Sequence, residues 1–334
     1  MNRTTIRWGI LGVGDVCEVK SGPAFQRAEH SELVAVMRRD SAKAEDFARR
    51  HGVGRWYDSV PELLGDPEID AIYIATPPRY HLEHALAALA AGKDVYLEKP
   101  MAMNADECRQ IIKAEEKSNN KIALAHYRRA LPAFTKIREL IKNGTLGSVR
   151  LAELNFFLPE SNTLIPETGD NWRVNPAVSG GGLFHDLSPH MFDLLLDYFG
   201  QPLAYEGFSL RQNSKSPADD FVQGTIRFEN NIIFRGCWCF TVAETAVSES
   251  LVITGNKAQV SCTFFGDEMR LRTAEGEQII PFTNPVNIQQ PMIEQVSRYF
   301  LGEIPCPCSS ADGLMVMEII DAFSQGRKGG PGLK

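Results

Sequence analysis

The chain has 334 residues, 43% of them hydrophobic and 23% charged, which is typical of a globular protein and suits two domains better than one core. Its formal charge of −7 and scattered Lys and Arg residues argue against a nucleic-acid or acidic-membrane partner, because phosphate binding needs clustered basic side chains. No apolar stretch approaches the ~20 residues that span a bilayer, and the polar start, Met1 to Ile6, is unlike a signal peptide.

Seven cysteines occur at irregular spacings, so we expect free thiols in a reducing cytoplasm rather than a disulfide framework. Cys237 with Cys239, and Cys306 with Cys308, form C-x-C pairs whose thiols share one face if they lie on strands. A structural zinc ion usually takes four ligands at recognisable spacings, and no such set is present. We therefore predict no metal site.

The first third of the chain alternates apolar runs with helical patterns. Apolar runs predict strands, and apolar spacing predicts helices; the strands are at 6–11, 33–37, 71–75, 94–97 and 122–125, and the helices at 42–50, 80–91 and from Asn104, as its cap, to about 119. Continuous apolar strands separated by helices predict a parallel sheet covered on both faces. We expect an α/β Rossmann domain over residues 1–126.

The remaining chain, residues 127–334, has a different pattern and predicts an α+β domain. Strand follows strand from 204 to 282, with turns at 229–231 and 255–257, which indicates a large, mostly antiparallel sheet. Outside that stretch we expect a strand, a loop, three helices and a loose tail: helix 134–141, strand 150–157, a loop rich in Pro, Asn, Thr and Gly at 158–182, helix 187–198 with Ser188-Pro189 near its start, helix 311–325, and the tail from Gly326.

A glycine pattern, Gly9-Ile-Leu-Gly12-Val-Gly14-Asp15-Val16-Cys17, directly follows the first predicted strand. Gly12 permits a tight turn, and Gly14 lets a pyrophosphate approach backbone N–H groups at a helix N-terminus. We expect Gly12, Gly14, Asp15 and Val16 to bind a dinucleotide. Cys17 replaces the third glycine of the usual fingerprint, where a small residue is tolerable for packing. An ordinary glycine turn is the alternative, and the position in an alternating domain favours the dinucleotide.

Two arginines follow the second predicted strand, in the order Met37-Arg38-Arg39-Asp40. A carboxylate at this place accepts from the ribose 2′-OH of NAD, whereas arginine meets the 2′-phosphate of NADP. Arg38 and Arg39 therefore favour NADP(H), and NAD(H) stays possible, since both arginines could simply be solvated. We expect Asp40 to cap the next helix.

The third predicted strand runs into Ala75-Thr76-Pro77-Pro78-Arg-Tyr-His81. Ligands of open α/β sheets lie beyond the carboxyl ends of strands. We therefore expect Thr76, Pro77 and His81, at the start of the next helix, near the dinucleotide. His84, one turn later, is expected to pack or to face solvent.

Glu98-Lys99-Pro100 ends the fourth predicted strand and faces the same edge. A lysine before proline has a tightly fixed direction, and an X–Pro bond can be cis where a sharp turn is needed. We expect Glu98 and Lys99 to lie at the cofactor, with Lys99 also at the substrate.

Three glycines precede an Asp–His pair in Ser179-Gly-Gly-Gly182-Leu-Phe-His185-Asp186-Leu-Ser-Pro-His190. Asp186 and His190 are four residues apart, so on a helix they share one face. The glycines allow the backbone to approach a ligand closely. An Asp beside a His suits proton transfer to or from a hydroxyl. A purely structural Asp–His hydrogen bond is the alternative.

These segments together resemble the glucose–fructose oxidoreductase, inositol dehydrogenase and MocA (Gfo/Idh/MocA) family. The resemblance follows the chain in order: Gly12-x-Gly14, Ala75-Thr-Pro-Pro78 with His81, Glu98-Lys99-Pro100, and Gly180-Gly-Gly182 with Asp186 and His190. It implies a Rossmann domain followed by an open antiparallel-sheet domain for substrate binding and oligomerisation, as a homodimer or homotetramer. Arg38-Arg39-Asp40 looks closest to NADP-using branches such as the dimeric dihydrodiol dehydrogenases.

The resemblance also implies roles for single residues. Lys99 would hydrogen-bond the reacting oxygen, His190 would be the general acid/base, and Asp186 would orient the substrate and His190. The loop and the end of the last Rossmann strand supply further substrate contacts: Trp172, which can stack on a sugar face, Arg173, Tyr127 and Arg128. The last two could equally hold the domains together.

Three functions fit this pattern. The first is an NAD(P)-dependent dehydrogenase or reductase acting on a CH–OH or C=O carbon of a sugar, polyol or related cyclic alcohol. The second is a non-catalytic dinucleotide- or sugar-binding regulator, which predicts loss of the lysine or histidine, whereas Lys99 and His190 are both present. The third is a glycosidase that uses a tightly held nicotinamide, and fold alone does not separate these.

Overall fold

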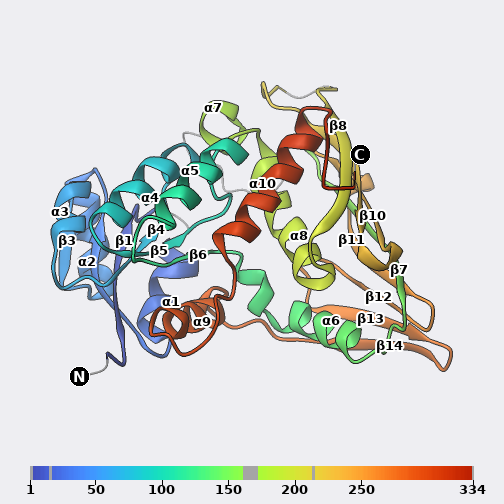
Figure 1. Ribbon diagram of the computed structural model, residues 1–334, viewed down its shortest axis with the longest axis horizontal. Helices are drawn as coiled ribbons and strands as arrows, with labels where there is room; N and C mark the ends of the chain where they lie inside the picture. Colours follow the sequence, from blue (N-terminus) through green and yellow to red (C-terminus); the bar gives the residue numbers. More distant parts are fainter. Residues whose placement is uncertain (1–2, 15–16, 161–171, 213–214, 333–334) are drawn as a thin grey trace. The chain divides into compact units, whose positions relative to one another are not determined.

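The computed structural model describes residues 3–14, 17–160, 172–212 and 215–332 (Figure 1). The chain forms two compact units, the first from Met1–Leu131 with Pro285–Leu314, and the second from Pro132–Asn284 with Met315–Lys334. The division expected from the sequence placed the boundary after residue 126 and assigned all of 127–334 to the second domain. The return of Pro285–Leu314 to the first unit is the main difference.

The first unit contains a six-stranded sheet whose pairs are all parallel. The order β3-β2-β1-β4-β5-β6 is the doubly wound arrangement, with the switch point between β1 and β4. Its strands are β1 (Ile6–Leu11), β2 (Ser31–Met37), β3 (Arg55–Tyr57), β4 (Ala71–Ile74), β5 (Asp94–Leu97) and β6 (Ile122–Leu124). The predicted Rossmann sheet is confirmed, and only the three-residue strand β3 was not expected.

Helices cover both faces of this sheet, with α4 packed on α5 on one face and α1 packed on α9 on the other (Figure 1). Asp40 and Asn104 cap their helices as predicted, accepting from the backbone N–H of Lys43 at 3.2 Å and of Glu107 at 2.9 Å. The helical segments are η1 (Cys17–Ser21, a π-helical turn), α1 (Gly22–Arg27), α2 (Ser41–His51), α3 (Val60–Gly65), η2 (Pro78–Tyr80), α4 (His81–Ala90), α5 (Ala105–Glu115), η3 (Tyr127–Ala130) and α9 (Gln290–Phe300).

An aromatic cluster explains why the late segment with α9 joins the first unit. Trp8 and Tyr73 on neighbouring strands are fully buried, and the Trp8 ring lies 4.9 Å from that of Phe25. From α9, Phe300 places its ring 5.6 Å from Trp8. Lys121 adds hydrogen bonds from its ammonium to the carbonyl oxygens at the end of α9. Burying these large rings is the main favourable term for docking the segment.

The second unit contains a nine-stranded sheet in the order β14-β13-β12-β11-β7-β10-β9-β8-β15. All its pairs are antiparallel except β7 with β10, so the predicted mostly antiparallel sheet is confirmed. Both predicted turns join antiparallel strands, and Asn230 and Asn231 take positive φ angles in the first. The strands are β7 (Val149–Phe157), β8 (Pro202–Leu210), β9 (Phe221–Phe228), β10 (Ile233–Cys239), β11 (Ser248–Gly255), β12 (Gln259–Cys262), β13 (Glu268–Thr273), β14 (Gly276–Pro281) and β15 (Lys328–Gly329).

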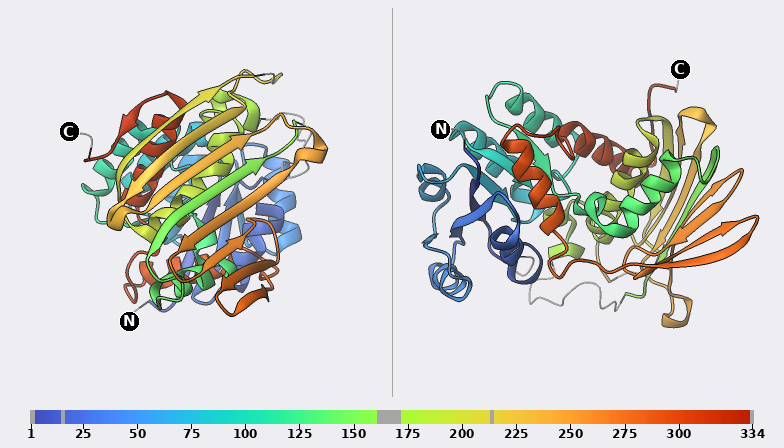
Figure 2. Two further views of the ribbon diagram at one scale, coloured as in Figure 1. Left: turned by 90° about the vertical axis from the view of Figure 1, so that its right-hand side faces the viewer. Right: turned by 90° about the horizontal axis from the view of Figure 1, so that it is seen from below.

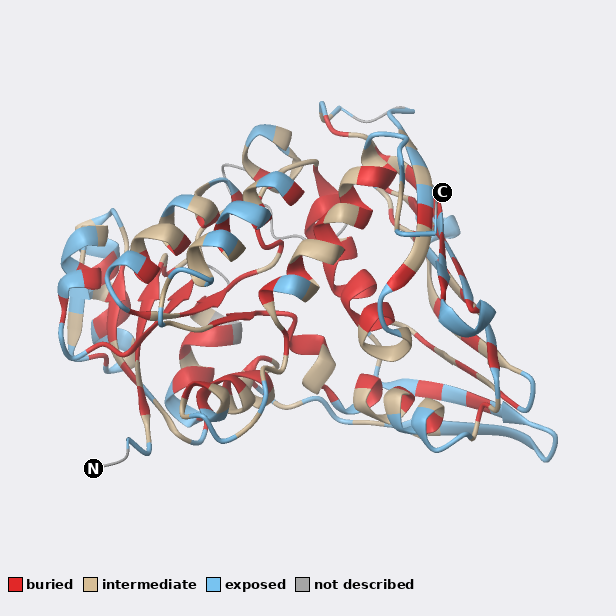
Figure 3. Ribbon diagram, in the orientation of Figure 1, coloured by how far each residue is buried: buried red, intermediate tan, exposed pale blue. Residues whose placement is uncertain are grey.

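One face of this sheet carries the core of the second unit (Figure 3). The rings of Phe192, on α8, and Phe323, on α10, lie 5.4 Å apart, and Trp238 of β10 lies 5.4 Å from Phe192. Gly207 and Gly224 lack the Cβ atoms that would overlap Phe323. No helix of the described chain crosses the opposite face in Figure 2, left. The helical segments here are α6 (Pro132–Lys142), η4 (Trp172–Val174), α7 (Pro176–Ser179), α8 (Leu183–Phe199), η5 (Glu229–Asn231), η6 (Glu244–Ala246) and α10 (Ser310–Ser324, in this unit from Met315).

The start of helix α8 differs from the prediction. The expected start at Leu187 is wrong, because the helix begins at Leu183 and contains Pro189 in its interior. Gly182, at φ +81°, turns the chain into the helix, and its carbonyl oxygen accepts the first-turn hydrogen bond from the N–H of Asp186 at 3.1 Å. Pro189 removes one backbone donor, and the hydroxyl of Ser188 bonds the carbonyl of Phe184 in the same turn at 2.6 Å.

The prediction of a loose tail from Gly326 is also wrong. Lys328–Gly329 forms strand β15, which pairs antiparallel with β8 at the end of the sheet, and the N–H of Gly332 donates to the carbonyl oxygen of Leu203 at 2.7 Å. Gly329 lacks the Cβ that would overlap the Tyr205 ring, so glycine allows the close pairing. The glycines that suggested mobility instead fit the tail onto the sheet edge.

Candidate active site

The glycine turn lies at the carboxyl end of β1, at the switch point of the first unit's sheet. Gly12 has φ +100°, and a Cβ there would approach within 2.8 Å of the Thr76 methyl at the end of β4. A Cβ on Gly14 would meet no atom of the described residues within 4 Å. The turn therefore needs Gly12 for its own conformation, while Gly14 leaves space of the kind a pyrophosphate requires. The predicted cofactor residues Asp15 and Val16 lie outside the described residues.

Cys17, in place of the third glycine, is fully buried. Its thiol donates to the carbonyl oxygen of Gly12 at 3.7 Å. Burial raises the pKa of Cys17 to about 12, so the side chain is a neutral thiol at physiological pH. It serves the packing behind the glycine turn.

Strand β2 ends at Met37, so Arg38 and Arg39 directly follow it, as the NADP hypothesis requires. The Arg38 guanidinium donates to the carbonyl oxygen of Val13, inside the glycine turn, at 3.0 Å. Arg39 is exposed, and its guanidinium carbon lies 5.4 Å from the centre of the Tyr80 ring. One arginine thus supports the turn and the other is presented to solvent beside an aromatic ring.

His81, which the sequence predicts near the cofactor, is held by two backbone carbonyl oxygens. The ring is fully buried, with Nε2 at 2.7 Å from the carbonyl oxygen of Thr76 and Nδ1 at 2.8 Å from that of Pro100. Burial lowers the pKa of His81. The residue ties the loop after β4, with Thr76 and Pro77, to the loop after β5, and the half-buried Thr76 and Pro77 remain at the edge.

Glu98 and Lys99 are fixed by residues that the sequence did not suggest. The buried Glu98 carboxylate accepts from the Tyr73 hydroxyl at 2.5 Å and from the Gln289 amide at 3.0 Å, and its second oxygen accepts from the N–H of Lys99 at 3.0 Å. The Lys99–Pro100 bond is cis, and the Lys99 side chain is half-buried. Gln289 lies 191 positions away in sequence, and no local pattern could have connected it with this strand end.

Tyr127 and Arg128 follow β6 at the same edge of the sheet and are both buried. The Arg128 guanidinium carbon lies 5.8 Å from the centre of the Tyr127 ring. The next residue, Arg129, donates to the carbonyl oxygen of Pro307 at 3.1 Å and pairs with Asp312 at 3.5 Å. This short segment therefore helps to hold the late part of the chain in the first unit.

In the second unit, the structure brings together the predicted residues of the loop and of α8. Asp186 and His190, one helical turn apart, are both buried. The Arg173 side chain pairs with the Asp186 carboxylate at 3.5 Å, and its guanidinium carbon lies 4.6 Å from the Trp172 ring centre. The buried Nη1 of Arg173 has no hydrogen-bond partner among the described residues. This grouping offers a carboxylate, an imidazole and an unused N–H donor to a polar ligand.

The glycines before α8 are needed for packing within the chain. A Cβ on Gly181 would overlap the ring of His185, and one on Gly182 would overlap Ala218. The ligand approach expected from the sequence at these glycines stays a prediction. Burial lowers the pKa of His185 to about 4, so this ring is neutral at physiological pH.

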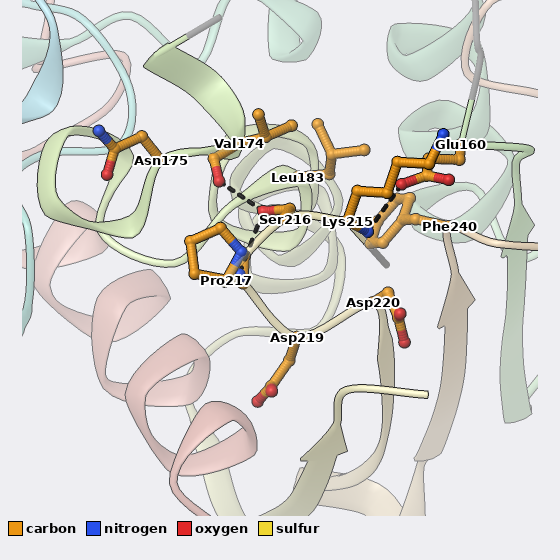
Figure 4. A pocket seen from close by; sticks show the side chains of 11 residues that line it. Glu160, Val174, Asn175, Leu183, Lys215, Ser216, Pro217, Asp219, Asp220 and Phe240 are labelled. Carbon is orange, nitrogen blue, oxygen red and sulfur yellow. Dashed lines mark hydrogen bonds between the residues drawn. The ribbon is translucent and has the colours of Figure 1, made fainter. Parts of the chain in front are cut away.

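The second unit also contains a cavity of about 540 Å³ (Figure 4). Three of its polar side chains are engaged within the chain: the Asp219 carboxylate accepts from Ser209, Asp220 accepts from the N–H of Gln212 at 2.8 Å, and the Ser216 hydroxyl donates to Val174 at 2.6 Å. The described lining does not include Arg173, Asp186 or His190, and consists of Glu160, Val174, Asn175, Leu183, Lys215, Ser216, Pro217, Ala218, Asp219, Asp220 and Phe240.

Comparison with known proteins identifies the family. Residues 6–126 match the model of the oxidoreductase family with an NAD-binding Rossmann fold, and residues 134–261 match the GFO/IDH/MocA C-terminal domain. The chain belongs to the Gfo/Idh/MocA oxidoreductase family. The prediction of a nicotinamide-dependent enzyme with this two-part fold is confirmed at that level.

Relatives within the family extend over nearly the whole chain. An oxidoreductase called P35 from Formosa agariphila is 42% identical over 95% of this chain and 98% of its own length. A 1,5-anhydro-D-fructose reductase from Ensifer adhaerens is 28% identical over 85% of each chain. The crystal structure of an aldose-aldose oxidoreductase from Caulobacter crescentus has a TM-score of 0.85 at 22% identity, covering 98% of this chain and 99% of its own. Across the described residues, no helix has the length and apolar character needed to cross a membrane.

Proposed function

We propose that the protein transfers a hydride between NADP(H) and a CH–OH or C=O carbon of a sugar, polyol or related cyclic alcohol. The observation that carries this proposal is the clamp on Glu98, in which Tyr73, Gln289 and the Lys99 N–H fix the strand end that presents Lys99. Leaving a buried carboxylate without hydrogen-bond donors costs free energy, so these three hydrogen bonds are maintained. They set the direction of Lys99 before any ligand binds. Such preorganisation suits a residue that contacts a reacting group.

The first unit supplies the residues for the cofactor. The nicotinamide, when bound, accepts or donates the hydride. Backbone groups of the glycine turn would hold the pyrophosphate, and the arginines after β2 would meet the 2′-phosphate. The proposed set is Gly12, Gly14, Asp15, Val16, Arg38, Arg39, Thr76, Pro77, Glu98 and Lys99, with His81 fixing the loops that carry Thr76 and Lys99.

Three residues would act on the reacting hydroxyl or carbonyl group. The Lys99 ammonium would donate a hydrogen bond to the reacting oxygen and stabilise the charge that develops there. The His190 imidazole would take the hydroxyl proton during oxidation and return it during reduction. Asp186 would orient His190 and the substrate, and its own position is held by the 3.5 Å pairing with Arg173.

The proposed substrate is polyhydroxylated. One relative is named as a 1,5-anhydro-D-fructose reductase, and this name supports a sugar-like substrate for the present chain. In this chain, Trp172 provides an aromatic face and Arg173 a buried N–H donor, groups that suit the apolar face and the oxygens of a sugar. Tyr127 and Arg128 are proposed as further contacts.

The direct test is an assay of the purified protein with NADPH and a panel of ketoses, dicarbonyls and osuloses, and with NADP⁺ and the matching alcohols, followed at the nicotinamide absorbance band. The account predicts turnover with at least one sugar-like substrate. A flat trace for every substrate, in both directions and with both NADP(H) and NAD(H), would reject the dehydrogenase function. Such a result would favour a binding protein or a glycosidase without net cofactor turnover.

The cofactor preference has its own test. Replacing Arg38 and Arg39 together by Ala should weaken binding of NADPH by at least about 100-fold, because two charge-assisted contacts of about 1.5–3 kcal/mol each are lost, and should change NADH binding much less. Dissociation constants from nicotinamide fluorescence would measure this. Arg109, an exposed arginine on α5 that pairs with Asp106, provides the control as Arg109→Ala. Equal losses for both cofactors would contradict the preference.

The proposal includes assembly as a homodimer or homotetramer through the uncovered face of the nine-stranded sheet. The strand register places Phe208, Leu210 and Ile233 on this one face, and all three are exposed. Exposed apolar side chains gathered on a sheet face suit burial against a second copy. The same face carries the half-buried thiols of Cys237 and Cys239.

A further inference from the structure

Three side chains link the end of β2 to the end of β4 in the first unit. The Arg39 guanidinium carbon lies 5.4 Å from the centre of the Tyr80 ring. The Tyr80 ring in turn stacks on that of His84, with centres 5.8 Å apart and planes 19° apart. The cation therefore rests on a pair of stacked rings from the segment that follows β4.

The ring pair is itself anchored to the cofactor edge. Nδ1 of His84 lies 3.1 Å from the Thr76 hydroxyl, and the Thr76 methyl fills the space beside Gly12. Burial lowers the pKa of His84, so the ring stays neutral at physiological pH and does not repel Arg39 through Tyr80. The position of the Tyr80 ring is thus fixed relative to the glycine turn.

Arg39 needs such support because its side chain is exposed and long. An arginine free in solvent samples many rotamers, and holding it in one place when a ligand binds costs conformational entropy. An aromatic face under the guanidinium reduces that cost and adds a cation–π attraction. Arg38 does not share this arrangement, since its guanidinium donates to Val13 inside the turn.

We infer that Tyr80 is a positioning residue for cofactor specificity: its ring holds the Arg39 guanidinium ready for the 2′-phosphate of NADP(H). The inference rests on the proposed preference for NADP(H). It adds Tyr80, which lies outside the segment after β2, to the residues that determine this preference. Tyr80 acts through Arg39, so it should affect a cofactor with a 2′-phosphate and leave one without it nearly unchanged.

Fluorescence titration of the full chain with NADPH and NADH tests this. Tyr80→Ala should raise the Kd of NADPH about 5-fold, in line with one lost exposed cation–π contact and one newly mobile arginine, while the Kd of NADH changes less than 2-fold. Tyr80→Phe, which keeps the ring, should bind both cofactors as the wild type does. Tyr80→Leu, which keeps apolar bulk without the ring, should match Tyr80→Ala and guards against poor folding of that variant.

A double variant separates positioning from a general structural role. In an Arg39→Ala background, Tyr80→Ala should cause no further loss of NADPH affinity, because the residue it positions is gone. An equal loss for NADPH and NADH, or a loss that persists without Arg39, would overturn the inference. A wild type without any preference for NADPH would overturn the proposed cofactor preference as well, whereas a preference for NADPH that is undiminished in Tyr80→Ala and Tyr80→Leu would overturn only the role of Tyr80.

Discussion

Glu98 bonds both to its neighbour in sequence, Lys99, and to a residue far along the chain, Gln289. Its neighbour Lys99 is visible in the short Glu-Lys-Pro pattern, whereas the partners that fix it, Tyr73 and Gln289, come from β4 and from the segment before α9. Desolvation raises the pKa of Tyr73 well above its usual value, so its hydroxyl remains a neutral donor to the carboxylate. The position of Lys99 thus depends on a hydrogen bond that no local pattern encodes.

His185 gives a pH dependence to the stability of the second unit. Its pKa of about 4 in the folded chain lies below the ordinary histidine value of about 6.5. Between these values the unfolded chain binds the proton and the folded chain does not, so stability falls as the pH drops below about 6.5 and levels off near the folded pKa. From pH 7.5 to pH 5 the expected loss is about 2 kcal/mol from this residue alone.

Urea unfolding of the wild type and of His185→Gln at both pH values measures this contribution. The wild type should lose about 2 kcal/mol more than the variant on going to pH 5, because Gln does not titrate. A variant whose stability falls as steeply as that of the wild type would show that His185 is not the group responsible.

Site residues could be predicted where their chemistry is local. The turn glycine Gly12 and the cap Asp40 could be read from spacing alone, because a positive φ and an N-cap are local demands. His81 was correctly placed at a helix start, but its two backbone partners depend on how two loops meet. Sequence spacing does not contain that information.

At the scale of elements, the start of α8 is set by glycines that leave room for neighbouring side chains. Gly181→Ala should destabilise the second unit by about 1–3 kcal/mol, since its Cβ would overlap the His185 ring in a packed region. Gly54→Ala is the matched control, because its Cβ would meet no atom of the described residues within 4 Å and its φ is not positive. Thermal unfolding of both variants measures the difference, and equal midpoints would contradict the packing role.

The elements whose bounds were predicted best are those with a clear pattern of apolar residues within their own sequence. β1 and β5 have the bounds expected from their apolar runs. β3 was missed because Arg55–Tyr57 is three residues long and not apolar, and β15 because two residues beside glycines carry no strand pattern. Both lie at the edge of a sheet and gain their structure from the single strand against which they pair, β2 or β8.

At the scale of the whole molecule, chain order and structural units do not coincide. The segment Pro285–Leu314 packs with the first unit through Phe300 on Trp8 and Gln289 on Glu98. Composition and periodicity describe single segments of sequence. They could therefore indicate one domain boundary, but they could not reveal that Pro285–Leu314 packs with the first unit. The Rossmann order and the large sheet, by contrast, follow from repeated local patterns.

The proposed assembly predicts a particle heavier than one chain of 37.1 kDa. Light scattering after size-exclusion chromatography should give twice or four times that mass. Replacing Phe208 and Ile233 together by Glu should yield the single-chain mass, because charges would be placed on the face to be buried. Val286→Glu, at a position 89% exposed in the first unit, should leave the mass unchanged. A single-chain mass for the wild type, or an unchanged mass for the double variant, would contradict this interface.

In the proposed mechanism, Lys99 donates a hydrogen bond to the reacting oxygen while His190 moves its proton in the same step. A double-variant cycle on the single-turnover rate of NADPH oxidation, at saturating cofactor and with the best substrate of the panel, tests it most directly. Lys99→Ala and His190→Ala should each slow hydride transfer at least 100-fold while NADPH binding survives, and the double variant should be little slower than the slower single variant. Losses that multiply in the double variant, or a single variant with wild-type rate, would contradict the claim.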